Sequence, residues 1–226
     1  MSASCCHHHH DPQRGNPGFK RVLLIVLAIN AVMFLVEIGA GVAAGSASLQ
    51  ADALDFLGDT GNYIIGLAVV GMALHYRAMA ALAKGLTMGA FGLWVIGTVV
   101  WHALMGTVPE PITMGVIGGV ALIANAACAA LLYAYREGDA NMRSVWICSR
   151  NDVVGNLAVL LAALGVFGTA SGWPDLIVAT IMAILAVQGA WIVSQRAHDE
   201  LWSAAASKAP DLPAPAHQLG APARRP

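Results

Sequence analysis

The sequence predicts an all-α membrane protein with six transmembrane helices and both termini in the cytoplasm. Of its 226 residues, 58% are hydrophobic and only 11% are charged, whereas a soluble domain carries roughly 25% charged residues. The mean hydropathy of +0.66 points the same way. Six apolar runs follow one another, each near the ~20 residues that span a bilayer, at residues 21–44, 51–74, 85–105, 112–135, 145–168 and 174–195.

These runs divide the chain into three parts. The first run is too long for a secretory signal, whose apolar core has about 7–15 residues, so we expect a retained helix. Residues 21–197 then form one six-helix transport domain. Residues 1–20 form a cytoplasmic tail that contains Cys5, Cys6 and four histidines, and residues 198–226 form an Ala/Pro-rich tail that we expect to be disordered.

The basic residues predict the orientation of the helices. The turns around Ser46, Pro109 and Gly172 contain no Lys or Arg, whereas the alternate connections and both tails carry nearly all of them: Arg14, Lys20, Arg21, Arg77, Lys84, Arg136, Arg143, Arg196, Lys208, Arg224 and Arg225. By the positive-inside rule, both termini are cytoplasmic. Arg150, inside the fifth run, is the exception.

Two apolar runs contain ionisable residues at matched spacings. Asp55 and Asp59 lie four residues apart in the second run, and Cys148 and Asp152 do so in the fifth. Four residues are about one helical turn, so each pair lies on one face. The two runs enter the membrane from opposite sides, and the rise of 1.5 Å per residue places both pairs near the middle of the bilayer. An ionisable group there costs a few kcal/mol, which indicates a functional site.

A weak internal similarity accompanies these pairs. Asp59 precedes Thr-Gly-Asn62, and Asp152 precedes Val-Val-Gly-Asn156, each in the second helix of a three-helix half. A duplication of three helices would be a 3+3 inverted repeat, an architecture common in transporters. Chance similarity between two helices rich in small residues explains the match about as well.

Around these residues the chain resembles the cation diffusion facilitator family of divalent-metal transporters. The resemblance covers the membrane portion from Asn30 and Glu37 onward, and it rests on Gly45-Ser-Ala-Ser-Leu49, Asp52-Ala-Leu-Asp55-Phe-Leu-Gly-Asp59, Cys148-Ser-Arg-Asn-Asp152 and Trp173-Pro-Asp175. In that family, two residues from each of the second and fifth helices, usually His or Asp, hold the transported ion. The resemblance therefore implies a metal site formed by Asp55, Asp59, Cys148 and Asp152.

The chain departs from the family pattern in two ways. Cys148 stands where the family usually has His or Asp. The family also commonly has a soluble carboxy-terminal domain, which we expect this short member to lack, so that a homodimer would form through the membrane domain. One thiolate and three carboxylates suit Zn²⁺ and also Cd²⁺, and possible further cargo is Co²⁺ or Ni²⁺, whereas an all-oxygen Mg²⁺ or Ca²⁺ site is a poor match.

These residues predict a secondary transporter rather than an enzyme. Metal and protons compete for the same ligands, so we expect export of Zn²⁺-like cations from the cytoplasm, across a bacterial inner membrane, by proton antiport with alternating access. No cofactor is expected, and the absence of a phosphate-binding loop argues against ATP drive. A net charge of −1 argues against a nucleic-acid partner. Three alternatives stay open. The first is that Asp55 and Asp59 are structural residues that cap or bridge helices or pair with Arg150. The second is an intramembrane aspartyl protease that uses Asp59 and Asp152, and the third is a metal sensor or channel.

Overall fold

The computed structural model describes residues 17–68, 74–134 and 140–206, which form six α-helices in the predicted order. These helices are α1 (Pro17–Ala44), α2 (Ala47–Ala68), α3 (Leu74–Met105), α4 (Pro111–Tyr133), α5 (Ala140–Thr169) and α6 (Trp173–Ala206). Five of them are long and apolar enough to cross a membrane. The sixth, α2, has 22 residues and carries three aspartates. The all-α membrane fold is therefore confirmed, while the inverted repeat and the cytoplasmic side stay predictions.

Two helices extend well beyond the expected runs. Helix α3 begins at Leu74 and so includes residues 75–84, which we expected in a connection, because this segment consists largely of the helix formers Ala, Leu and Met. Helix α6 continues to Ala206, into the expected tail, because no proline occurs between Pro174, in its first turn, and Pro210. Residues 1–16 and 207–226, which hold most of both predicted tails, lie outside the described residues.

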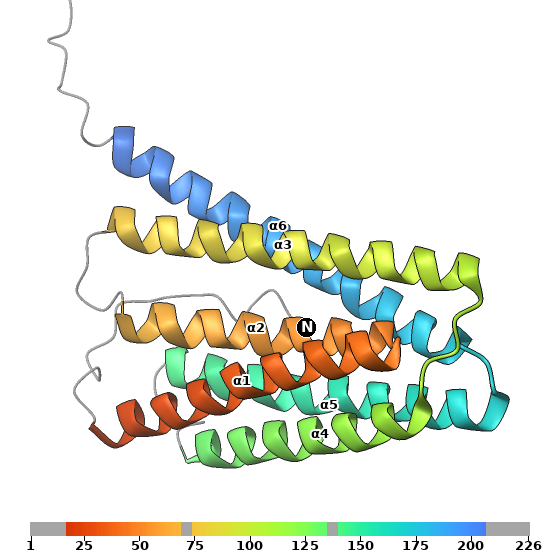
Figure 1. Ribbon diagram of the computed structural model, residues 1–226. Coiled ribbons are helices and arrows are strands. Elements are labelled where there is room, and N and C mark those ends of the chain that lie inside the picture. The colour runs from red at the N-terminus through yellow and green to blue at the C-terminus, as the bar shows by residue number, and fades with distance from the viewer. Residues whose placement is uncertain (1–16, 69–73, 135–139, 207–226) are drawn as a thin grey trace, which may run out of the picture.

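The helices form two groups, with α2 where they meet. In Figure 1, α3 and α6 run along one side of the molecule, and α1, α2, α4 and α5 lie on the other. Helix α2 packs against α1, α3, α5 and α6. Glycines allow α3 and α6 to approach closely, since a Cβ added to Gly92 would lie 2.7 Å from Cγ2 of Val187. Such contacts between small residues are typical of membrane helix packing.

Three short turns lie at the same end of the bundle, on the right in Figure 1. They join α1 to α2, α3 to α4 and α5 to α6, and they are the turns that lack Lys and Arg. Gly45 adopts a positive φ of 64° in the first turn, a conformation that favours glycine. The N–H of Glu110 donates to the carbonyl of Ala44 at 3.0 Å, so the first two turns are bonded to each other.

Asp175, in the first turn of α6, caps the start of α2. Its carboxylate accepts hydrogen bonds from Oγ of Ser46 at 2.7 Å, from the N–H of Ala47 at 2.8 Å and from the N–H of Ser48 at 3.0 Å. The first N–H groups of a helix have no partner within the helix, and Asp175 supplies it from another helix. This contact fixes the beginning of α2, which carries the predicted ligands.

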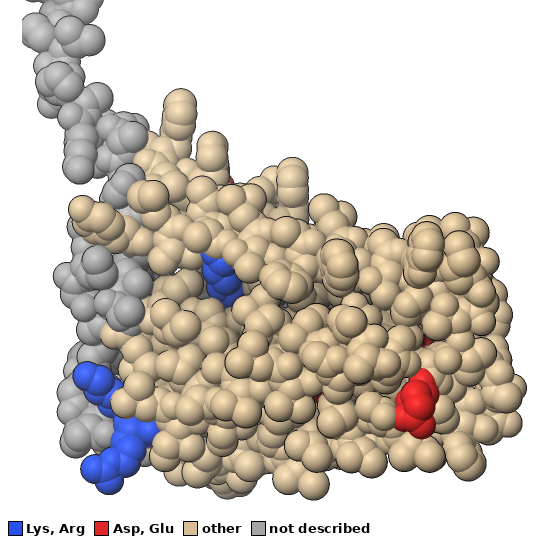
Figure 2. Space-filling view, in the orientation of Figure 1, with Lys and Arg blue, Asp and Glu red and all other residues tan. Residues whose placement is uncertain are grey.

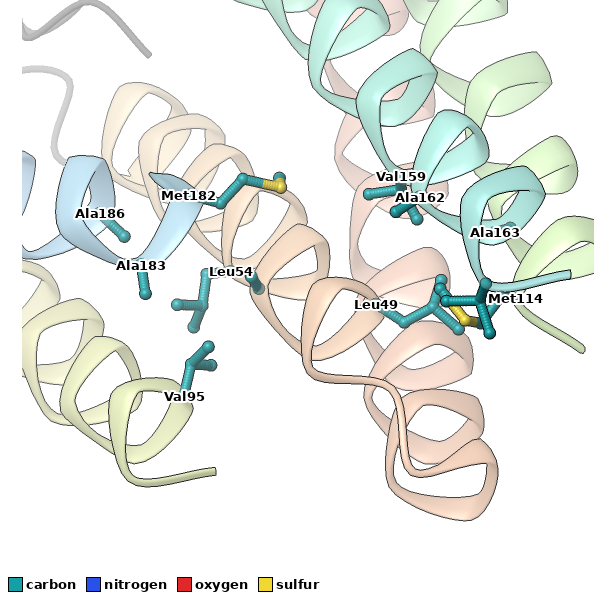
Figure 3. Close-up of a cluster of buried hydrophobic side chains, with 12 residues drawn as sticks. Leu49, Leu54, Val95, Met114, Val159, Ala162, Ala163, Met182, Ala183 and Ala186 are labelled. Carbon is teal, nitrogen blue, oxygen red and sulfur yellow. The ribbon is translucent and has the colours of Figure 1, made fainter. Parts of the chain in front are cut away.

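The main hydrophobic core lies between these turns and the middle of the bundle. Figure 3 shows Leu54 of α2 directed toward Val95 of α3 and Ala183 of α6, and Leu49 directed toward Met114 of α4. The outer surface is also apolar, with large side chains such as Leu104 and Ile123 more than two-thirds exposed. Figure 2 shows a face that is nearly free of charge between basic side chains toward one end and one small acidic area near the other. A lipid-facing bundle has this pattern.

Candidate metal centre

One face of α2 carries three buried aspartates. Asp52, Asp55 and Asp59 are spaced three and four residues apart, which places them on the same side of the helix, and they are 0%, 6% and 8% exposed. Helix α5 packs against α2 and contributes Asp152 and Asn156, which are 9% and 0% exposed. The contact region between α2 and α5 therefore contains four buried aspartates, Asp52, Asp55, Asp59 and Asp152.

Asp59 of α2 and Asp152 of α5 are neighbours across the two helices. Their carboxyl groups interact directly. Oη of Tyr63 donates a hydrogen bond to Oδ2 of Asp59 at 2.9 Å and lies 3.4 Å from Oγ of Ser149, on α5. Two carboxylates in contact repel each other unless a proton or a cation lies between them. Of the four predicted ligands, the structure thus brings Asp59 and Asp152 together across α2 and α5, while their role as metal ligands stays a prediction.

The structure describes less of the surroundings of the other two predicted ligands, Asp55 and Cys148. Asp55 is buried on the same face as Asp59, and its Oδ1 lacks a hydrogen-bond partner among the described residues. Cys148 belongs to α5, one turn before Asp152, but its side chain lies outside what the structure describes. Among the described side chains, no three of the His, Cys, Asp and Glu type lie where one metal ion could touch them all. The four-ligand site stays a prediction.

A second polar group lies one to two turns away, toward the end with the short turns. Asn125 of α4 donates to Asn156 of α5 at 3.1 Å, and Asn156 donates to Oδ2 of Asp52. Asp52 in turn interacts with the carboxyl group of Glu37, on α1. Within the described part of the chain, neither oxygen of Glu37 has a hydrogen-bond donor. This chain of polar side chains joins α1, α2, α4 and α5 beside Asp55.

Only part of this second polar group is predictable from the sequence. Glu37 was singled out only by the family resemblance, and the structure places its carboxyl group against that of Asp52, on a different helix. Asp52 lies seven residues before Asp59, a spacing that signals a shared helix face. Asn125 has no local signal of this kind, because only the packing of α4 against α5 brings it to Asn156.

Two basic side chains lie on the helices near the centre. Arg150 is exposed, and its guanidinium lies 5.5 Å from the centre of the Trp146 ring, an arrangement typical of a long basic side chain that reaches toward the membrane surface. Lys84 of α3 is half-buried, and its Nζ donates a hydrogen bond to Oδ1 of Asn62, on α2. The charge of Lys84 also attracts Asp59.

These features define a class of protein: a multi-pass helical membrane protein with an acidic site between two of its helices. Comparison with known families identifies it further. The cation efflux transmembrane domain matches residues 23–205, so the chain belongs to the cation efflux family, as the resemblance predicted. Members of this family are transporters, which excludes the protease alternative. The chain is a multi-pass protein of the bacterial inner membrane.

The chain is similar to two characterised bacterial proteins at low identity. It is 23% identical over 198 residues to the metal cation efflux system protein CzcD of Cupriavidus metallidurans, covering 82% of this chain and 62% of CzcD. It is 26% identical over 207 residues to the zinc transporter ZitB of Escherichia coli, covering 85% of this chain and 64% of ZitB. The chain thus spans less than two-thirds of the length of these relatives.

Proposed function

We propose that this protein exports Zn²⁺-like divalent cations from the cytoplasm in exchange for protons, by alternating access. The ion would be held in the membrane by Asp55 and Asp59 of α2 and by Cys148 and Asp152 of α5. Protons and metal are the partners of this cycle, and the metal is cargo rather than a cofactor.

The observation that carries the proposal is the contact between Asp59 and Asp152. Both side chains are more than nine-tenths buried, they come from different helices, and their carboxyl groups interact directly. Such a pair takes up either a divalent cation or protons. Exchange of one for the other at the same oxygen atoms is the chemical basis of an antiporter.

The ligand types favour a borderline or soft ion. Cys148 adds a thiolate to the carboxylates, and thiolates select zinc or cadmium over magnesium or calcium. The names of the relatives agree with this class of cargo, since one is called a metal cation efflux system protein and the other a zinc transporter.

The proposal is tested by zinc flux into sealed vesicles. The purified protein is reconstituted with a zinc-sensitive dye inside the vesicles, and an acidic interior is imposed so that outward-moving protons drive zinc inward. We expect zinc accumulation that stops when a proton ionophore removes the gradient. Zinc flux that ignores the gradient would instead indicate a channel, and zinc binding without flux would indicate a sensor.

Two variants locate the site in the same assay. Asp152→Ala removes one carboxyl group from the pair, and we expect it to abolish flux. Asp199→Ala is the matched control, because it removes an exposed carboxyl group in the last part of α6. Wild-type rates in Asp152→Ala would refute the proposed site.

A further inference from the structure

The side chain of Lys84, on α3, packs against α2 at Gly61, where the absence of a Cβ atom leaves room for it. A Cβ added to Gly61 would lie 3.2 Å from Cγ, 3.3 Å from Cδ and 3.6 Å from Cε of Lys84. The aliphatic part of the lysine therefore packs against the backbone of α2, where almost any other residue would crowd it. The contact is continuous along the side chain, which indicates that the lysine is held in place.

The amino group at the end of this side chain is directed to the candidate metal centre. Nζ donates to Oδ1 of Asn62, which lies three residues after Asp59 and on the same side of α2. Lys84 also attracts Asp59 electrostatically. The residue belongs to α3, in the helix group that lies opposite α5. It therefore brings a positive charge to Asp59 from a helix other than α5.

We propose that Lys84 is a tethered competitor of the transported cation. Its ammonium group, positioned by Gly61 and Asn62, balances the charge of Asp59 when the ion site is empty and is displaced when a divalent cation binds. This inference rests on the proposed function and assigns to α3 a role in it. Lys84 belongs to α3, in the group of α3 and α6, whereas Asp59 and Asn62 belong to α2, in the other group. Release of Lys84 when the metal binds would therefore remove a contact between the two groups.

The proposed competition predicts the direction in which the affinity for the divalent cation changes when Lys84 is replaced. A positive charge near a divalent cation weakens its binding, so neutralising Lys84 should strengthen binding and slow release. General damage to the fold would weaken binding instead. A unit charge within about 10 Å of a divalent ion, at an effective dielectric constant of about 20, accounts for a change of at least about tenfold in affinity.

The experiment measures the zinc concentration that gives half-maximal flux into the vesicles described above. Lys84→Gln and Lys84→Met remove the charge, and the second keeps an apolar side chain of similar length against Gly61. Lys84→Arg keeps the charge. Lys20→Gln removes a charge from an exposed position at the start of α1 and is the control for general attraction of ions to the protein.

We expect the half-saturating zinc concentration to fall by at least about tenfold in Lys84→Gln and Lys84→Met, together with the maximal rate. Lys84→Arg and Lys20→Gln should keep the wild-type concentration. An unchanged or higher half-saturating concentration in both uncharged variants, beside normal wild-type flux, would overturn this inference alone. Absence of zinc flux in the wild type would overturn the proposed function as well.

Discussion

Replacing Asp175 with alanine should destabilise the protein by about 2–4 kcal/mol. The carboxylate is fully buried and accepts hydrogen bonds from the hydroxyl group of Ser46 and from the N–H groups of Ala47 and Ser48. Alanine would leave both N–H groups buried without a partner, at about 1–3 kcal/mol for each. Removing a buried carboxylate offsets part of this loss, because the cost of its desolvation disappears.

The assay is equilibrium unfolding in detergent micelles, followed by the fluorescence of the six tryptophans. Glu110→Ala is the matched control, because Glu110 also caps a helix, accepting from the N–H groups of Ile112 and Thr113, but is exposed. Water replaces an exposed cap, so this control should lose less stability. Equal losses in Asp175→Ala and Glu110→Ala would refute the idea that burial makes the contact between α6 and α2 important.

Three further predictions concern the polar groups. Asn156→Leu leaves Oδ2 of Asp52 without its donor and should lower the free energy of unfolding by about 1–3 kcal/mol in the same assay; an unchanged unfolding midpoint would contradict this. Hydrogen bonds from the side chain and the N–H of Thr113 lower the pKa of Glu110, so its stabilising contribution is present above the pKa of the unfolded chain and is lost as the pH falls through the folded value. Glu110→Gln should therefore be less stable than the wild type at neutral pH but equally stable in acid, and a difference that persists in acid would argue against this cap. Cys148→His should retain zinc flux and lose cadmium flux, because imidazole is a harder ligand than a thiolate; retained cadmium flux would show that the thiol is not a ligand.

The sequence predicted the order of the helices, and it predicted that the residue pairs on the second and fifth helices lie at the same depth. Both depend on regular features: apolar runs of bilayer length, and residue pairs one helical turn apart on two antiparallel segments. Tertiary packing does not change these features, because they depend only on the length of each segment and on the number of residues per helical turn. The contact between the two aspartates then follows once α2 and α5 pack together.

The parts that the sequence did not predict depend on tertiary packing. Lys84 was expected in a connection between helices, but α3 begins at Leu74, eleven residues before the expected start, and places Lys84 against Gly61 of α2. The contact of Glu37 with Asp52 joins residues from different helices whose rotation about their axes no local pattern specifies. The side chain of Cys148 lies outside the described residues, so its role depends on experiment.

The most direct test of the central claim is a measurement of zinc bound to purified protein at equilibrium. Cys5, Cys6 and the four histidines at residues 7–10 would bind zinc independently, so serine or alanine replaces them in every protein compared. We predict that zinc remains bound after these replacements and is lost in Asp59→Asn and in Asp152→Asn. Undiminished zinc binding in both of these variants would show that the carboxyl pair between α2 and α5 does not hold the ion.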